Sequence, residues 1–246
     1  MRRTRASLYS TAIGGAGDIM AYGSYGRPVL AFPSESGRCT DYEDRGMVDA
    51  IAWLIGEGRV KVYSVDSFDG SSWLAEDLTL EERALRHTFF EGWIIDQVVP
   101  WIHEDCSGAI EVIVTGCSFG AFHAANFALK RADLFPLAIC QSGVYDMGLL
   151  GGSERGNAFY FNNPMDYVAN LHGDHLEWLQ RQLNLLLVCG QGQWEDTTGA
   201  LDSTKRFGSL VASKGLRHEV DLWGGDVPHD WPSWRNQIAH HLPRFC

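Results

Sequence analysis

The stretch Val112–Lys130, VIVTGCSFGAFHAANFALK, places Ser118 between two glycines, Gly116 and Gly120. An apolar, β-branched run precedes this serine, and small, helix-forming residues follow it. This G-x-S-x-G arrangement is typical of a tight turn between a strand and a helix that exposes a nucleophilic hydroxyl, and the turn needs small neighbours because it brings the two backbones together. The alternative is that Ser118 only caps the helix. The strand and helix around it favour the nucleophile.

A nucleophilic serine needs a base, and the base needs an acid that orients it. Of the nine histidines, His229 follows the last predicted strand (218–224), at the sheet edge where parallel strands end and ligands bind. The acid is expected in the loop after the strand at 183–190, because the chain order is serine, acid, histidine. We expect Asp196, since its distance from the next helix leaves a loop of usual length. The adjacent Glu195 is the alternative, and Asp202 is next in line.

Stabilising an oxyanion requires two backbone N–H groups directed at one point. The residue after the nucleophile, Phe119, supplies the first. The second is expected from the loop after the strand at 28–33, where either Ser34 or Glu35 would supply it.

The remaining chain provides the elements that must position these residues. Strand-like and helix-like runs alternate, and several strands are apolar throughout, which indicates a mostly parallel sheet of about eight strands with helices on both faces. We therefore expect a single α/β domain over residues 1–246. The strands are predicted at 7–13, 19–23, 28–33, 60–65, 110–116, 137–143, 183–190 and 218–224.

Two segments raise specific expectations. In the helix predicted at 78–105, Thr79 and Glu82 can form a capping box, and an apolar stripe follows at Leu85, Phe89, Trp93, Ile94, Val98 and Trp101. Residues 145–181 interrupt the alternation with a glycine- and asparagine-rich insertion. That insertion could cap a pocket at the end of the sheet, or it could be an inert surface excursion.

Composition narrows the possible partners. The formal net charge is −11, which argues against a nucleic-acid partner. No apolar run approaches the length of a membrane span, and the basic N-terminus lacks the apolar region of a secretory signal, so we expect a cytoplasmic protein without a membrane partner. The six cysteines form no CxxC pair and no zinc-like spacing, which favours free thiols and no metal. The sequence does not indicate an oligomeric state.

These motifs together resemble the α/β-hydrolase esterases that include S-formylglutathione hydrolase, the mycolyltransferases and polyhydroxyalkanoate-depolymerase-like esterases. The resemblance is carried by GCSFGAFHA at the turn, SVDSFDGSSW after the fourth strand, FFEGWIIDQVVPWI before the turn, and HDWPSW around the histidine. It implies the α/β-hydrolase fold, with Ser118, an acid after the seventh strand and His229 as the triad. The chain departs from the family where FPSESG replaces the usual His-Gly or Asp-Gly.

The expected activity is hydrolysis of a small-molecule carboxylic ester through an acyl-enzyme, without a metal or organic cofactor. Aromatic residues on the predicted loops suit an aryl, acyl or sugar ester, and we expect Trp73, Tyr145 and Trp231 to contact the substrate. Two alternatives remain: an acyltransferase that uses the same triad with an alcohol acceptor, and a non-catalytic binding protein on the same fold.

Overall fold

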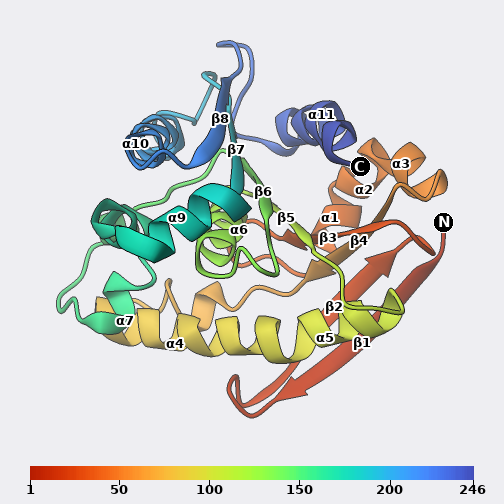
Figure 1. Ribbon diagram of the computed structural model, residues 1–246, viewed down its shortest axis with the longest axis horizontal. Coiled ribbons are helices and arrows are strands. Elements are labelled where there is room, and N and C mark those ends of the chain that lie inside the picture. Colours follow the sequence, from red (N-terminus) through yellow and green to blue (C-terminus); the bar gives the residue numbers. More distant parts are fainter.

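The computed structural model describes all 246 residues and is built around one eight-stranded sheet (Figure 1). The strand order is β1-β2-β4-β3-β5-β6-β7-β8. Strands β1, β2 and β4 are antiparallel neighbours, whereas β4, β3 and β5 to β8 run parallel. The predicted fold is therefore confirmed. The strands are β1 (Arg3–Ser10), β2 (Gly15–Tyr22), β3 (Arg27–Phe32), β4 (Val60–Val65), β5 (Ile113–Cys117), β6 (Leu137–Gln141), β7 (Asn184–Cys189) and β8 (Arg217–Leu222).

The central strands β3 to β7 are almost entirely buried because both faces of the sheet are covered. Successive residues point to opposite faces, so that in β3 Leu30 and Phe32 enter one core while Val29 and Ala31 enter the other. The first core receives side chains from α4 (Leu80–Trp93), α5 (Val99–Asp105), α6 (Phe119–Lys130) and α10 (Ala200–Ser213). The second receives side chains from α1 (Asp41–Asp44), α2 (Met47–Ala50), α3 (Ala52–Gly56) and α11 (Trp231–His241).

The helix predicted at 78–105 is interrupted and partly rotated. The capping box forms as expected, with the Glu82 N–H donating to Thr79 and the Glu82 carboxylate accepting from it. A π-helical turn, Ile94–Val98, joins α4 to α5. The predicted stripe is wrong in its first half, because Leu85 and Phe89 are 47% and 42% exposed. The inward face of α4 is formed instead by two buried polar side chains and four apolar ones, namely Leu80, Arg83, Ala84, His87, Phe90 and Trp93.

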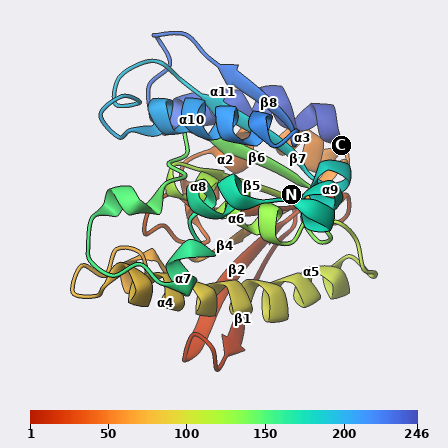
Figure 2. The ribbon, with the colours of Figure 1, turned by 60° about the vertical axis from the view of Figure 1, so that its left-hand side comes forward.

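The loops at the carboxyl ends of the parallel strands gather on one side of the molecule, at the left in Figure 2. The insertion at 145–181 begins on this side of the molecule and then runs away from it. Its helix α7 (Asn157–Tyr160) is fastened to α4 because the Glu81 carboxylate accepts the N–H groups of Gly156, Ala158 and Phe159. The chain then continues through α8 (Pro164–Tyr167) and returns to the opposite edge at α9 (Gly173–Gln182). Only the first half of the insertion lies near these loops. The cap over a pocket therefore concerns that half alone and stays a prediction beside its alternative, an inert surface excursion.

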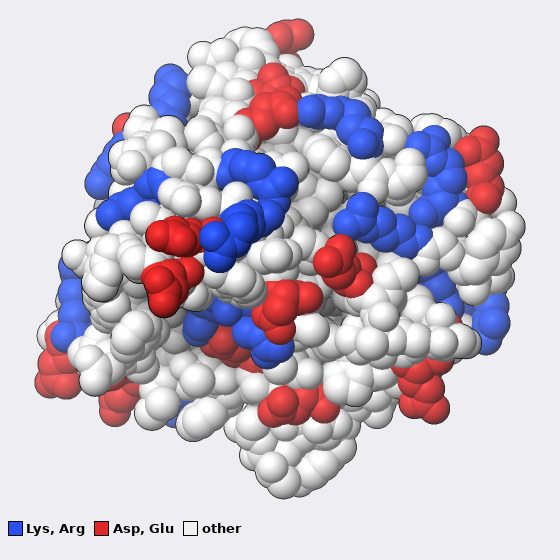
Figure 3. Space-filling model, in the orientation of Figure 1, with Lys and Arg blue, Asp and Glu red and all other residues white.

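The surface carries both charge signs. On the face shown in Figure 3, Lys and Arg are interspersed with Asp and Glu. Elsewhere in the structure, exposed residues of opposite charge pair along helices, as Arg181 does with Glu177 and Arg206 with Asp202. No helix of the structure combines the length and the apolar composition that crossing a bilayer requires.

Candidate active site

The turn between β5 and α6 holds Ser118 in a strained conformation. Its φ of 56° and ψ of −119° lie in a region that residues with a side chain rarely adopt. The flanking glycines make this turn possible. A Cβ on Gly116 would lie 2.2 Å from the carbonyl oxygen of Gly120, and a Cβ on Gly120 would lie 2.3 Å from that of Pro33. The Ser118 N–H donates to Gln141 O at 2.8 Å, which ties the turn to β6.

The imidazole of His229 lies directly against this serine. Its Nε2 is 3.0 Å from Ser118 Oγ. The loop that carries it is fixed by its own backbone, since the His229 N–H donates to Gln193 O at 2.9 Å. The ring also packs edge-on against Trp234, with the centroids 5.0 Å apart. The structure thus brings Ser118 and His229 together as expected from the order of the strands.

The carboxylate on the other side of the imidazole belongs to Glu195, so the expectation of Asp196 is wrong. Glu195 Oε2 lies 3.0 Å from His229 Nδ1, and the Glu195 side chain is fully buried. Asp196 is exposed and accepts only the N–H of Thr197. The cause is the turn before them, where Trp194 adopts a left-handed φ of 70° and so directs the next side chain inward. Asp202 is also excluded, because it lies exposed on α10 beside Arg206.

Further donors hold the buried Glu195 carboxylate in place. Its Oε1 accepts from Ser142 Oγ at 2.5 Å and from the Gly190 N–H at 3.2 Å. Its Oε2 also accepts from Cys189 Sγ at 3.3 Å. Burial and the adjacent carboxylate raise the pKa of the Cys189 thiol, so Cys189 donates as a neutral group. This set of donors compensates for burying a charge and fixes the orientation of the carboxylate.

Three backbone N–H groups have no acceptor within the chain: that of Phe119, directly after the serine, and those of Ser34 and Glu35 in the loop after β3. The close approach of Gly120 to the carbonyl oxygens of Phe32 and Pro33 brings the loop after β3 beside the start of α6. The Glu35 side chain is exposed. The free N–H groups of Phe119 and of this loop are therefore the candidates for receiving an oxyanion formed at the serine.

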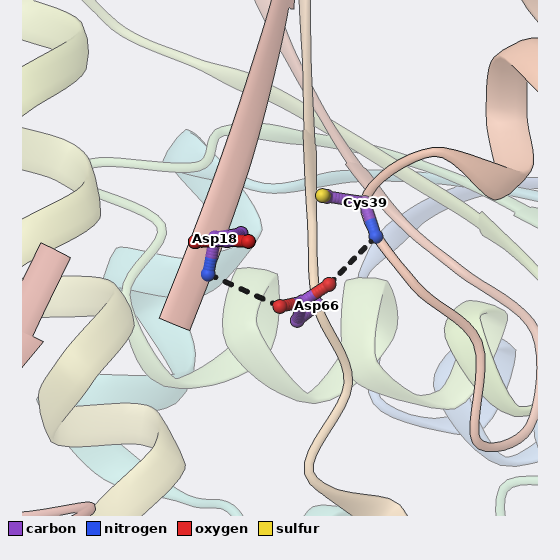
Figure 4. Close-up of side chains that lie close together, drawn as sticks. All are labelled: Asp18, Cys39 and Asp66. Carbon is purple, nitrogen blue, oxygen red and sulfur yellow. Dashed lines mark hydrogen bonds between the residues drawn. The ribbon is translucent and has the colours of Figure 1, made fainter. Parts of the chain in front are cut away.

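The carboxylate of Asp66, directly after β4, holds the loop after β3. Asp66 accepts the N–H of Cys39 at 2.9 Å and the N–H of Asp18 at 3.1 Å, as Figure 4 shows. These three side chains offer possible metal ligands within 4.8 Å of one another, but Asp18 is already paired with Arg5. The contacts of these residues join β2 and the end of β4 to the loop after β3.

Two of the three predicted substrate contacts are wrong. Trp73 and Tyr145 are fully buried: Trp73 packs against Phe122, and Tyr145 stacks on Phe207. Trp73 belongs to a small buried cluster between α4 and α6, and Tyr145 belongs to the first core. Trp231 is partly exposed two residues after the histidine.

An imidazole between a serine hydroxyl and a buried carboxylate, on this fold, defines the class of the protein as an α/β-hydrolase serine esterase. The family model described as "Putative esterase" matches residues 44–245, and the chain belongs to this family. No curated protein sequence matches the chain.

Solved structures share the fold at low sequence identity. A ferulic acid esterase superposes with a TM-score of 0.76 at 14% identity, covering 99% of this chain and 97% of its own. An S-formylglutathione hydrolase from Agrobacterium tumefaciens gives 0.74 at 12%, covering 98% and 93%. The fluorophosphonate-binding serine hydrolase F of Staphylococcus aureus gives 0.68 at 15%, covering 99% and 97%.

Proposed function

We propose that the protein hydrolyses small-molecule carboxylic esters through a triad of Ser118, His229 and Glu195. The observation that carries this proposal is the continuous chain of contacts, 3.0 Å from Ser118 Oγ to His229 Nε2 and 3.0 Å from His229 Nδ1 to Glu195 Oε2. The geometry requires no movement for the first proton transfer, since both distances are within hydrogen-bond reach.

In the first half-reaction, Ser118 Oγ attacks the ester carbonyl carbon while His229 Nε2 takes the hydroxyl proton. The negative charge that develops on the carbonyl oxygen is stabilised by the N–H of Phe119 together with that of Glu35 or Ser34. His229 then gives its proton to the departing alcohol, and the acyl group remains on Ser118. Glu195 stabilises the imidazolium and keeps the proton on Nδ1.

In the second half-reaction, a water molecule attacks the acyl-enzyme while His229 Nε2 takes a proton from that water. The acid is released and Ser118 recovers its proton. Trp231, partly exposed beside the histidine, is the aromatic side chain that we propose to contact the substrate.

The test is a series of p-nitrophenyl esters of increasing acyl length, assayed with and without an added alcohol. We expect turnover in the wild-type protein and its loss in both Ser118→Ala and His229→Ala, because triad members act as a unit. The matched control is His218→Ala, since His218 lies at the start of β8. It is therefore on the side of the sheet where the parallel strands begin, away from the triad.

Activity that survives in Ser118→Ala, or that is lost in His218→Ala and kept in His229→Ala, would refute the assignment. Transfer of the acyl group to the alcohol in preference to water would instead indicate an acyltransferase with the same triad.

A further inference from the structure

A buried carboxylate and a buried imidazole lie next to the proposed oxyanion hole, outside the triad. Asp69 Oδ1 is 2.8 Å from His123 Nε2, and each side chain is 1% exposed. Asp69 follows β4, whereas His123 lies on α6, five residues after Ser118. The proposed reaction does not use either residue, so their burial needs another explanation.

The other oxygen of Asp69 binds the loop that carries Glu35. Asp69 Oδ2 accepts the N–H of Ser36 at 3.1 Å, and Ser36 adopts a left-handed φ of 53°. The same turn is closed by the Gly37 N–H, which donates to Ser34 O at 2.9 Å. Asp69 therefore fixes the peptide that follows Glu35 and stabilises a turn in which the Ser36 backbone is strained.

His123 is fixed at the other end of this connection. Its ring packs against Phe119, with the centroids 5.3 Å apart, and stacks on His87 at 5.2 Å. Phe119 is the residue whose N–H forms the other half of the proposed hole. These contacts, from Ser36 through Asp69 to His123, thus connect the loop after β3 to the start of α6. Those two backbone segments must hold their N–H groups at a fixed separation.

We propose that Asp69 and His123 are positioning residues that set the geometry of the oxyanion hole. This inference rests on the proposed function. Donors aimed at a developing charge lose their effect when they shift, because the stabilisation depends on their being placed in advance. Loosening the turn should therefore lower kcat while ground-state binding of the ester, and hence KM, changes little.

The principal variant is Asp69→Ala, which removes the acceptor of the Ser36 N–H. We expect kcat to fall by roughly 10- to 100-fold, somewhat less than deletion of an oxyanion donor causes, with KM within about threefold. Amide exchange at Ser36, followed by NMR, should accelerate at least about tenfold, because that N–H loses its buried partner.

A conservative variant separates geometry from charge. In Asp69→Asn, the amide oxygen can still accept from the Ser36 N–H while the amide NH₂ faces His123 Nε2. That nitrogen can become an acceptor if the ring proton moves to Nδ1, which has no partner in the structure. We therefore expect Asp69→Asn to keep kcat within about threefold of wild type and to keep Ser36 protected.

The matched control is Asp105→Ala. Asp105 pairs with Lys61, whose side chain is 3% exposed, and accepts from the Tyr63 hydroxyl, near the opposite edge of the sheet. Its removal should lower Tm without changing kcat per folded molecule.

The positioning role is overturned if Asp69→Ala keeps kcat within about threefold, if Asp105→Ala loses as much kcat as Asp69→Ala, or if exchange at Ser36 is unchanged. The failure of the proposed function would appear differently, as an inactive wild-type protein. In that case, amide exchange at Ser36 in wild type and in Asp69→Ala would still show whether Asp69 holds this turn.

Discussion

Replacing Glu195 by glutamine should almost abolish turnover although the side chain keeps its shape. The Oε1 position accepts from a backbone N–H, that of Gly190, and from the Ser142 hydroxyl, which itself receives Trp234 Nε1–H. A backbone N–H cannot change its role, so the new amide oxygen must take this position. The amide NH₂ then takes the Oε2 position and faces His229 Nδ1.

This orientation forces the wrong tautomer on the histidine. Facing a donor, His229 must accept at Nδ1 and carry its proton on Nε2, where it meets the Ser118 hydroxyl and cannot accept a proton from it. The corresponding carboxylate-to-amide change in other serine hydrolases costs roughly 10⁴ in kcat, which corresponds to about 5 kcal/mol of transition-state stabilisation. We expect a loss of that order here.

The assay is hydrolysis of p-nitrophenyl acetate, with kcat expressed per folded molecule. The matched control is Asp196→Asn, which removes one charge at the adjacent, exposed position. Asp196→Asn should keep kcat within about threefold of the wild-type value, because a solvated charge acts on the imidazole only through a screened field. Retention of more than about a tenth of the activity in Glu195→Gln, or a larger loss in Asp196→Asn than in Glu195→Gln, would show that Glu195 does not orient His229.

Three further predictions concern the surroundings of the triad. Ser142→Ala removes a hydroxyl donor from the buried acid and should lower both Tm and kcat, the latter by roughly three- to tenfold; unchanged steady-state kinetics would contradict this. Gly120→Ala should yield little folded protein by circular dichroism, because its Cβ would lie 2.3 Å from Pro33 O; a normal Tm would show that the turn can relax. Native protein at pH 8 should react with a thiol reagent only at Cys106 and Cys246, the two cysteines that are not buried, and burial raises the pKa of Cys246 and slows it; rapid reaction of a third thiol would contradict the packing.

Much of the site could be predicted because it follows from local patterns and from topology. The glycines beside Ser118 predict the turn, and the position of His229 after the last strand predicts that the two meet. Both expectations depend only on the order and type of the elements, which long apolar strands indicate clearly.

The choice between Glu195 and Asp196 could not be made in the same way. Loop length does not reveal which of two adjacent carboxylates points inward, since the left-handed Trp194 decides it, and tryptophan gives no sequence signal for that conformation. The Asp69–His123 contact joins residues 54 positions apart, and His123 looks like an ordinary helical residue in the sequence. Trp73 and Tyr145 illustrate the same limit, because an aromatic residue on a loop can equally pack beneath it.

Labelling of the serine itself tests most directly whether Ser118 is a nucleophile activated in the folded protein. A fluorophosphonate probe reacts with an activated serine, and peptide mass spectrometry locates the adduct. We expect a single adduct, on the peptide that contains Ser118, and none in Ser118→Ala. An adduct at another residue, or a folded wild-type protein that remains unlabelled at Ser118, would contradict it.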